Sequence, residues 1–277
     1  MSARKSPQPE GPPPPPTVQK IRIRYAKRGR LRFTSHRDVA RVLERAVRRA
    51  GLPVAHSAGF SPHPKISWLG ASPTGVASEA EYVEIGLTAP MDPDDVRTRL
   101  DASLPPDLDI LDAVVAGPGA LADRLEASAW QLRLPGVTVA DAERSVTAFL
   151  AEAEVLVSRR TKDGSRELDA RAAVVSITAT PPESGGTDHP CAILNTVVRH
   201  TTPVVRPDDV LAALRAVAAL DLDAPMVATR LAQGPLRGAT DGDAADPMPV
   251  TVSDPLEPDR VPGEPATPTS GVVTGTA

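Results

Sequence analysis

Aromatic residues and cysteine are scarce in this chain, and each shortage excludes certain structures and functions. Only seven of the 277 residues are aromatic, so the hydrophobic cores must be built from Val, Leu, Ile and Ala. Cys191 is the single cysteine, which excludes a disulfide framework within the chain, a metal site of cysteines alone and a cysteine-ligated iron–sulfur cluster. We therefore predict no resident metal or cofactor.

Long apolar runs are also absent. No stretch of about 18 apolar residues occurs, so the sequence predicts no membrane-spanning helix. The first 17 residues are polar and rich in proline, which differs from the apolar core of a secretory signal. The sequence also lacks the HExxH, GxSxG and Walker patterns. We expect a cytoplasmic protein that is more readily a binding protein than an enzyme.

Charged residues are distributed unevenly along the chain. The net charge is only −4, but residues 19–65 contain thirteen Lys or Arg residues against Asp38 and Glu44. The rest of the chain must then be strongly acidic. A segment with such an excess of one sign attracts a partner of the opposite sign, so the basic segment predicts a polyanion such as RNA.

Hydrophobic periodicity predicts a β-α-β-β-α-β order for a first domain, residues 19–117. Ile21, Ile23 and Tyr25 alternate with Arg22 and Arg24, which is typical of a half-buried strand. A helix with one apolar face follows Ser35 and ends at Gly51. The remaining elements are expected as strands at 54–57, 81–88 and 108–115, as an extended segment at 66–69 and as a short helix that begins at 93.

A second domain, residues 124–235, is predicted to repeat the first. The sequence Pro-Asp-Asp-Val at 93–96 recurs at 207–210, and Asp-Leu-Asp at 107–109 recurs at 221–223 with the same offset of 114. Asp163-Gly164 marks an additional hairpin in this copy. We therefore expect an α+β protein of two tandem ferredoxin-like domains. The regions 1–18 and 236–277, which are rich in proline, glycine and polar residues, are expected to be disordered tails.

The basic residues of the first domain are candidates for nucleic-acid binding. Alternation places Arg22 and Arg24 on the open face of the sheet, beside Tyr82, because the first and third strands are neighbours in this topology. Arginines also surround the solvent side of the first helix. The predicted phosphate contacts are Arg22, Arg24, Arg41, Arg45, Arg48 and Lys65, with Tyr82 as a more specific contact. The alternative is an ordinary solvated surface in an arginine-rich protein.

Two histidines are weaker candidates for catalysis. His36 stands at the start of the first helix, where a nearby helix terminus favours the neutral imidazole. His63 lies between two prolines in the loop Gly59–Lys65, whose conformations are restricted. Either histidine could serve in a metal-independent cleavage of RNA. Helix capping or loop packing is the structural alternative for both.

The segment Ile21–Ser67, with its Ser35-His36 pair and its GFSPHPK loop, resembles a bacterial radical-SAM-associated domain family of unknown function. Tyr82–Leu87 resembles a second motif of that family, and Leu168–Arg171 a third one. Arg37 departs from the family pattern, in which leucine is more usual. The resemblance implies a stand-alone member that has a separate radical SAM protein as a partner.

These observations give three functional hypotheses. The first is an RNA-binding or substrate-presenting accessory protein without an iron–sulfur cluster of its own. The second is a metal-independent ribonuclease that uses His36 or His63. The third is a protein-binding adaptor whose basic face meets an acidic partner.

Overall fold

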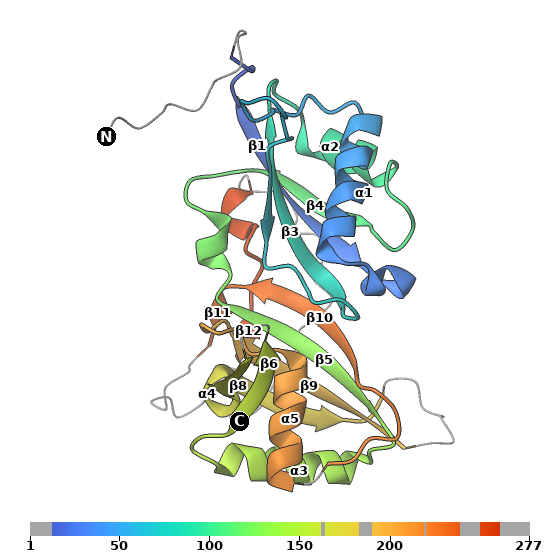
Figure 1. Cartoon of the computed structure of the whole chain (residues 1–277), viewed down its shortest axis with the longest axis vertical. Coiled ribbons are helices and arrows are strands. Elements are labelled where there is room, and N and C mark those ends of the chain that lie inside the picture. The colour runs from blue at the N-terminus through green and yellow to red at the C-terminus, as the bar shows by residue number, and fades with distance from the viewer. Residues whose placement is uncertain (1–12, 162–163, 183–189, 219, 239–249, 261–277) are drawn as a thin grey trace. The chain divides into compact units, whose positions relative to one another are not determined.

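The chain folds into two compact units, as the computed structural model shows (Figure 1). The structure describes residues 13–161, 164–182, 190–218, 220–238 and 250–260. The first unit is formed by the described residues up to Thr74, by Glu81–Gly119 and by the segment that begins at Leu256. The second unit is formed by Gly75–Ala80 and by the described residues from Ala120 to Pro255. The fold is thus α+β, as expected.

The first unit contains the element order predicted from its periodicity. Its strands lie in the order β4-β1-β3-β2, so the first and third strands are neighbours as expected. The elements are β1 (Gln19–Lys27), η1 (Gly29–Phe33), α1 (His36–Arg49), β2 (Ile66–Leu69), β3 (Ala77–Leu87), α2 (Pro93–Asp101), β4 (Ile110–Val115) and η3 (Glu257–Asp259). β3 begins in the second unit and enters the first after Ala80.

Both helices of the first unit cover one face of its sheet. Ile21 and Ile23 of β1 and Ile85 of β3 are fully buried in a core that also contains Leu43 of α1 and Leu100 of α2. Because side chains alternate along a strand, residues 20, 22 and 24 point to the opposite face. The two helices therefore divide the unit into a helical side and a second sheet face.

Local capping explains where the two helices begin. Ser35 accepts a hydrogen bond from the Asp38 backbone N–H at 3.3 Å, which confirms the predicted start of α1. Asp92 caps α2 in the same way, through the backbone N–H groups of Asp94 and Asp95. Gly51, just after α1, has a φ of +64°, a conformation that favours glycine.

Part of the expected C-terminal tail is folded instead. Residues 239–249 and 261–277 lie outside the described residues, as do residues 1–12 of the expected N-terminal arm. The described segment from Leu256 to Arg260, which we call the strap, packs on the second sheet face of the first unit. Leu256 is completely buried, and Asp259 and Arg260 form ion pairs with this unit. The prediction failed here because an irregular segment held by side chains has no periodicity.

The second unit has the same strand order, β10-β5-β9-β8, with additional elements inserted after its first helix. The insertion is the hairpin β6-β7, whose register runs from Leu156 opposite Asp169 to Thr161 opposite Gly164, followed by α4. Asp163 of the predicted turn lies outside the described residues. The elements are η2 (Leu121–Arg124), β5 (Ala127–Pro135), α3 (Val139–Ala151), β6 (Leu156–Thr161), β7 (Gly164–Asp169), α4 (Ala170–Ala173), β8 (Val174–Thr180), β9 (Cys191–Arg199), α5 (Pro207–Ala218), β10 (Val227–Gly234), β11 (Leu236–Arg237) and β12 (Thr251–Val252).

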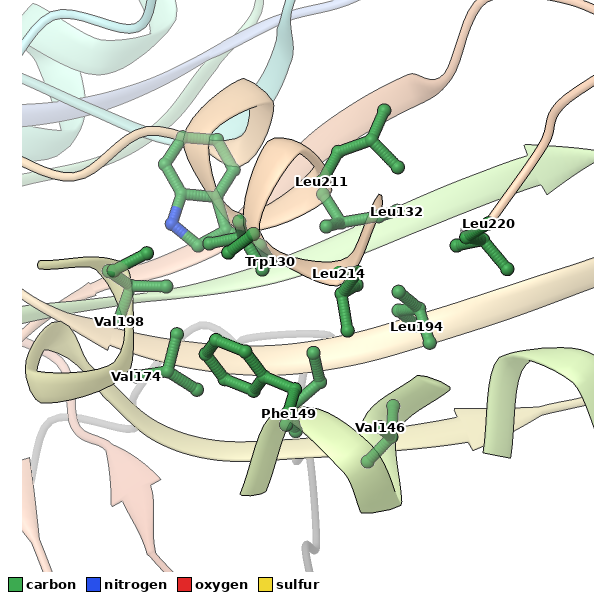
Figure 2. Packing of buried hydrophobic residues seen from close by; sticks show 14 of the residues in the cluster. Trp130, Leu132, Val146, Phe149, Val174, Leu194, Val198, Leu211, Leu214 and Leu220 are labelled. Atoms are coloured by element: carbon green, nitrogen blue, oxygen red, sulfur yellow. The ribbon is translucent and has the colours of Figure 1, made fainter. Parts of the chain in front are cut away.

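The core of the second unit is built mainly from aliphatic side chains, as the composition requires (Figure 2). Leu132 and Leu194 of the sheet and Leu214 of α5 are fully buried, together with Phe149 of α3. The sequence repeat marks equivalent positions, because Pro-Asp-Asp-Val begins α2 in one unit and α5 in the other. The aliphatic residues at the fourth and eighth positions of both helices are fully buried: Val96, Leu100, Val210 and Leu214.

The predicted strand at residues 54–57 does not form as a regular strand. Residues 54–57 form only isolated bridges, between Val54 and Leu87 and between His56 and Pro64. Pro64 has no backbone N–H and cannot continue a ladder, so the strand that pairs with β3 is Ile66–Leu69. Within the described part of the chain, no helix combines the length and the apolar character that a bilayer crossing requires.

Candidate functional site

The predicted phosphate contacts of the first unit, with their basic neighbours, fall into three groups that have different surroundings. The first group lies on α1, where Arg37, Arg41, Arg45 and Arg48 are exposed. Their spacing of four, four and three residues places them on one stripe of the helix, which we call the α1 stripe. Arg41 has an ion pair with Asp38 at 3.4 Å, and both side chains remain more than half exposed. The arginines of the stripe are therefore accessible, as predicted for Arg41, Arg45 and Arg48.

The second group, on β1, is buried. Arg22 and Arg24 are each only 2% exposed, so the prediction that they lie on an open sheet face is wrong. Tyr82, which was expected beside them on that face, is also 2% exposed. The predicted alternation is correct, but the face is not open to solvent.

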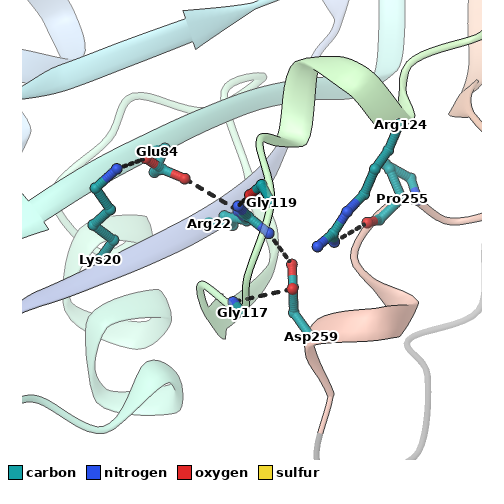
Figure 3. Close-up of polar contacts among 8 residues, drawn as sticks. All are labelled: Lys20, Arg22, Glu84, Gly117, Gly119, Arg124, Pro255 and Asp259. Carbon is teal, nitrogen blue, oxygen red and sulfur yellow. Dashed lines mark hydrogen bonds and ion pairs between the residues drawn. The ribbon is translucent and has the colours of Figure 1, made fainter.

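Arg22 is held by partners from three segments of the first unit (Figure 3). Its guanidinium donates hydrogen bonds to Glu84 Oε2 at 3.1 Å, to Asp259 Oδ2 at 2.7 Å and to the Gly119 carbonyl. Asp259 also accepts a hydrogen bond from the Gly117 backbone N–H at 3.0 Å. The strap thus supplies an internal carboxylate where an external phosphate was expected.

The electrostatics of this cluster favour its charged state. Burial acts against the charge of Arg22, but the hydrogen bonds and charges of Asp259 and Glu84 outweigh it and raise the pKa of the guanidinium. Burial would likewise raise the pKa of Glu84, yet the bonds from Lys20 and Arg22 together lower it. Nearby, Arg260 of the strap pairs with Asp112 of β4 at 2.6 Å, and both side chains are 8% exposed.

The third group surrounds a shallow pocket of about 300 Å³, which we call the loop pocket. It lies at one end of the second sheet face and is lined by Lys20, Ser57, His63, Lys65, Ser67 and Glu84, among others. Lys20 Nζ is 2.8 Å from Glu84 Oε1, whereas Lys65 Nζ donates to the neutral Thr17 Oγ1 at 3.4 Å. The predicted residues Lys65 and His63 thus come together, but on the face opposite to the helices.

The two candidate histidines have different surroundings. His36 is exposed at the start of α1, and its ring contacts Trp68 edge-on with 5.2 Å between ring centroids. His63 is exposed and lines the loop pocket beside Lys65. Two hydrogen bonds fix the backbone at His63: its N–H donates to Ser57 Oγ at 3.0 Å, and its carbonyl accepts from the Ser57 N–H at 2.8 Å.

Sequence reasoning missed several residues of these sites. Lys20 and Ser67 could have been found, because both share the strand face of Arg22 and Glu84 by simple alternation. Asp259 gave no such signal, since 237 positions separate it from Arg22 in the chain.

The comparison with protein families identifies the relatives of the chain. The sequence model of a family described as uncharacterized proteins conserved in bacteria (DUF2344) matches residues 20–207. The chain belongs to this family. The part of this DUF2344 protein that matches includes the α1 stripe, Arg22 and the loop from Ser57 to Lys65, whereas the strap lies outside it.

The other comparisons add little. No curated protein matches the chain. One similar solved structure is described as an unknown protein from Galdieria sulphuraria, with 13% identity over 76% of this chain and 98% of that one. Its TM-score of 0.22 supports no conclusion about fold or function.

Proposed function

We propose that this DUF2344 protein is an accessory protein that binds structured RNA through the α1 stripe. The observation that carries the proposal is the row of four exposed arginines on one face of α1. Among the described residues, the carboxylate that forms an ion pair with the stripe is Asp38, which is itself 54% exposed. A weak, solvated pair of this kind exchanges readily for a phosphate.

The geometry sets the size of the expected contact. The stripe covers twelve residues, whose eleven rises span about 16 Å of helix axis. Four phosphate contacts give a salt dependence of about −3.6 in log K against log salt, so affinity should fall about a hundredfold between 50 and 200 mM salt. This loss of affinity is smaller than the loss expected for six or more phosphate contacts. The number of contacts is lower because the buried Arg22 and Arg24 and the distant Lys65 do not belong to the stripe.

Charge reversal on the stripe tests the proposal. The variant with Arg41→Glu and Arg45→Glu should lose retention on structured RNA at 50 mM salt. A matched control, Arg97→Glu with Arg144→Glu, changes the net charge equally on exposed residues of α2 and α3. The control should retain the RNA. Equal weakening in both variants would mean that net charge alone drives binding, and the stripe would lose its assigned role.

The same variants separate RNA from an acidic protein partner. A complex isolated from cells that depends on the stripe and dissolves on nuclease treatment supports RNA. A stripe-dependent complex that survives nuclease treatment replaces the proposal with the adaptor function.

A metal-independent ribonuclease is the second candidate, and the position of His63 favours it. His63 shares the loop pocket with Lys65 and Ser67, which supply a cation and a hydroxyl beside the imidazole. His36 has an aromatic neighbour instead. RNA incubated with EDTA should then be cut at discrete positions by the native chain and left intact by His63→Ala. Cleavage that persists in this variant would exclude His63.

Two finer statements belong to the same proposal. Each unit is a ferredoxin-like domain, which is supported by the matching strand orders β4-β1-β3-β2 and β10-β5-β9-β8. The accessory protein acts beside a separate radical SAM protein, which is supported by the resemblance of Ile21–Ser67 alone. Co-purification of such an enzyme with the native chain would test the second statement.

A further inference from the structure

We propose that the loop pocket binds a phosphate group carried by a molecule the size of one nucleotide. This site is distinct from the α1 stripe and does not depend on RNA binding there. The proposal rests on the charge that the pocket leaves uncompensated, on its hydroxyl donors, on its volume and on the exposed aromatic ring of its loop.

The charge balance of the pocket favours an anion. Glu84 is the carboxylate of its lining, and both of its oxygens are already occupied, Oε1 by Lys20 and Oε2 by Arg22. Lys65 adds a further positive charge, and no carboxylate within the described residues forms an ion pair with it. A lysine in this setting acts as a point charge for phosphate.

Neutral donors surround the same space. Ser57, Ser67 and Thr17 bring hydroxyl groups, which can donate to phosphate oxygens, and His63 brings a ring N–H. The hydrogen bonds between Ser57 and His63 hold the two ends of the loop in place. Gly86 forms part of the wall, and a Cβ there would lie 3.0 Å from Thr17 Cγ2, so a larger residue would crowd the pocket.

The size and the loop indicate what carries the phosphate. A volume of about 300 Å³ lies at the lower end of the range for small-molecule sites. Phe60, between Ser57 and His63, is 73% exposed. Its Cα can be no more than about 11 Å from that of His63, because consecutive Cα atoms are about 3.8 Å apart. An exposed ring at this distance offers a stacking surface for a base.

The pocket and the stripe lie on opposite faces of the first sheet. Lys20 and Glu84 alternate with core residues that pack against α1, such as Ile21 and Ile85. A ligand in the pocket therefore leaves the stripe accessible. The phosphate can belong to a free mononucleotide or to the 5′ end of single-stranded RNA, and the experiment must separate these two sources.

Calorimetric titration of the full chain tests the proposal. The probes are adenosine 5′-monophosphate, adenosine, and a four-nucleotide single-stranded RNA with either a 5′-phosphate or a 5′-hydroxyl group. We expect binding of adenosine 5′-monophosphate but not of adenosine. Lys65→Met should weaken this binding at least about tenfold, because it removes a hydrogen bond to a charged group. Phe60→Ala should weaken it less.

The double variant Arg41→Glu and Arg45→Glu is the control that separates the two sites. It should bind adenosine 5′-monophosphate as the native chain does, even if it loses structured RNA. Tighter binding of the 5′-phosphorylated RNA than of the mononucleotide assigns the phosphate to an RNA end, and the reverse order assigns it to a free nucleotide. Lys65 is exposed, and thermal unfolding of Lys65→Met verifies that the variant is folded.

Three results would overturn the proposal. The first is that the native chain binds none of the phosphorylated probes at millimolar concentration. The second is that Lys65→Met binds them with unchanged affinity. The third is that adenosine binds as tightly as adenosine 5′-monophosphate.

Discussion

The arginines of β1 and those of α1 come from the same basic segment but have opposite environments. Arg22 of β1 is 2% exposed and holds two carboxylates and a carbonyl, whereas the four arginines of the α1 stripe are exposed to solvent. The two groups resemble each other in the sequence, because apolar residues stand between the arginines of each group. An excess of positive charge therefore indicates attraction, but it does not show which cations are available to a partner.

The difference has a physical cause. An exposed arginine keeps its hydration, so the protein need not supply partners for it. A buried guanidinium loses its water and must be compensated by carboxylates and hydrogen bonds. The first unit supplies these from β3, from the loop at Gly119 and from the strap. The comparison predicts that the two groups respond differently to substitution.

The largest effect is expected from Asp259→Asn. This change neutralises the fully buried one of the two carboxylates that bind Arg22, so the first unit should lose about 3 kcal/mol of its free energy of unfolding. Denaturant unfolding measures the loss. The control is Asp94→Asn, which removes an exposed carboxylate beside Arg97 and should cost under about 1 kcal/mol. Similar losses in the two variants would contradict the structural role of the strap.

A smaller effect, dependent on pH, is expected from a half-buried group whose contacts among the described residues include no carboxylate. His200 of the second unit is 2.8 Å from Ser128 Oγ and 2.7 Å from the Leu125 carbonyl. Burial, together with the charge of Arg230, lowers the pKa of His200 below its ordinary 6.5, although the Leu125 bond opposes the shift. The buried arginine thus keeps its charge, while the half-buried histidine favours its neutral form.

The sign of the effect follows from this lowered pKa. Below pH 6.5 the unfolded chain binds the proton of His200 more readily than the folded one. The contribution of His200 to stability is thus complete above pH 6.5 and is lost as the pH falls toward the folded-state pKa. Urea unfolding at pH 7.5 and 5.5 should show a smaller difference for His200→Gln than for the native chain. An equal difference would mean that other groups cause the pH dependence.

An effect of about 1 kcal/mol is expected at the start of the exposed helix. Ser35 caps α1 by accepting from the Asp38 N–H. Ser35→Ala should cost about 1 kcal/mol, because that N–H loses its side-chain acceptor. Thermal unfolding provides the measurement, with Thr34→Ala, one residue before the cap, as the control. No loss in Ser35→Ala would show that the cap contributes little to the helix that carries the stripe.

The smallest effect on stability is expected within the α1 stripe itself. Arg45→Gln and Arg48→Gln should each change the free energy of unfolding by no more than about 0.5 kcal/mol, since both residues are exposed. Each should nevertheless reduce the salt slope of RNA binding by about one. Destabilisation of either variant by several kcal/mol would show that the stripe arginines, like the buried Arg22, contribute to the stability of the first unit.

The sequence by itself determined the local structure of this protein. Alternation located β1 and β3, the apolar face and the Ser35 cap located α1, and the repeated Pro-Asp-Asp-Val located the equivalent helices α2 and α5. These features are local because a helix or strand repeats its pattern within a few residues. The exposed positions of Arg41, Arg45 and Arg48 followed from that pattern.

Only the tertiary structure decided which basic residues remain accessible. Periodicity shows that Arg22 points away from the apolar core, but it does not show what covers the other face of the sheet. That cover is the strap, whose Asp259 lies 237 positions away in a segment without any regular pattern. The loop pocket depends in the same way on Lys20, His63, Lys65 and Glu84, which only folding brings together.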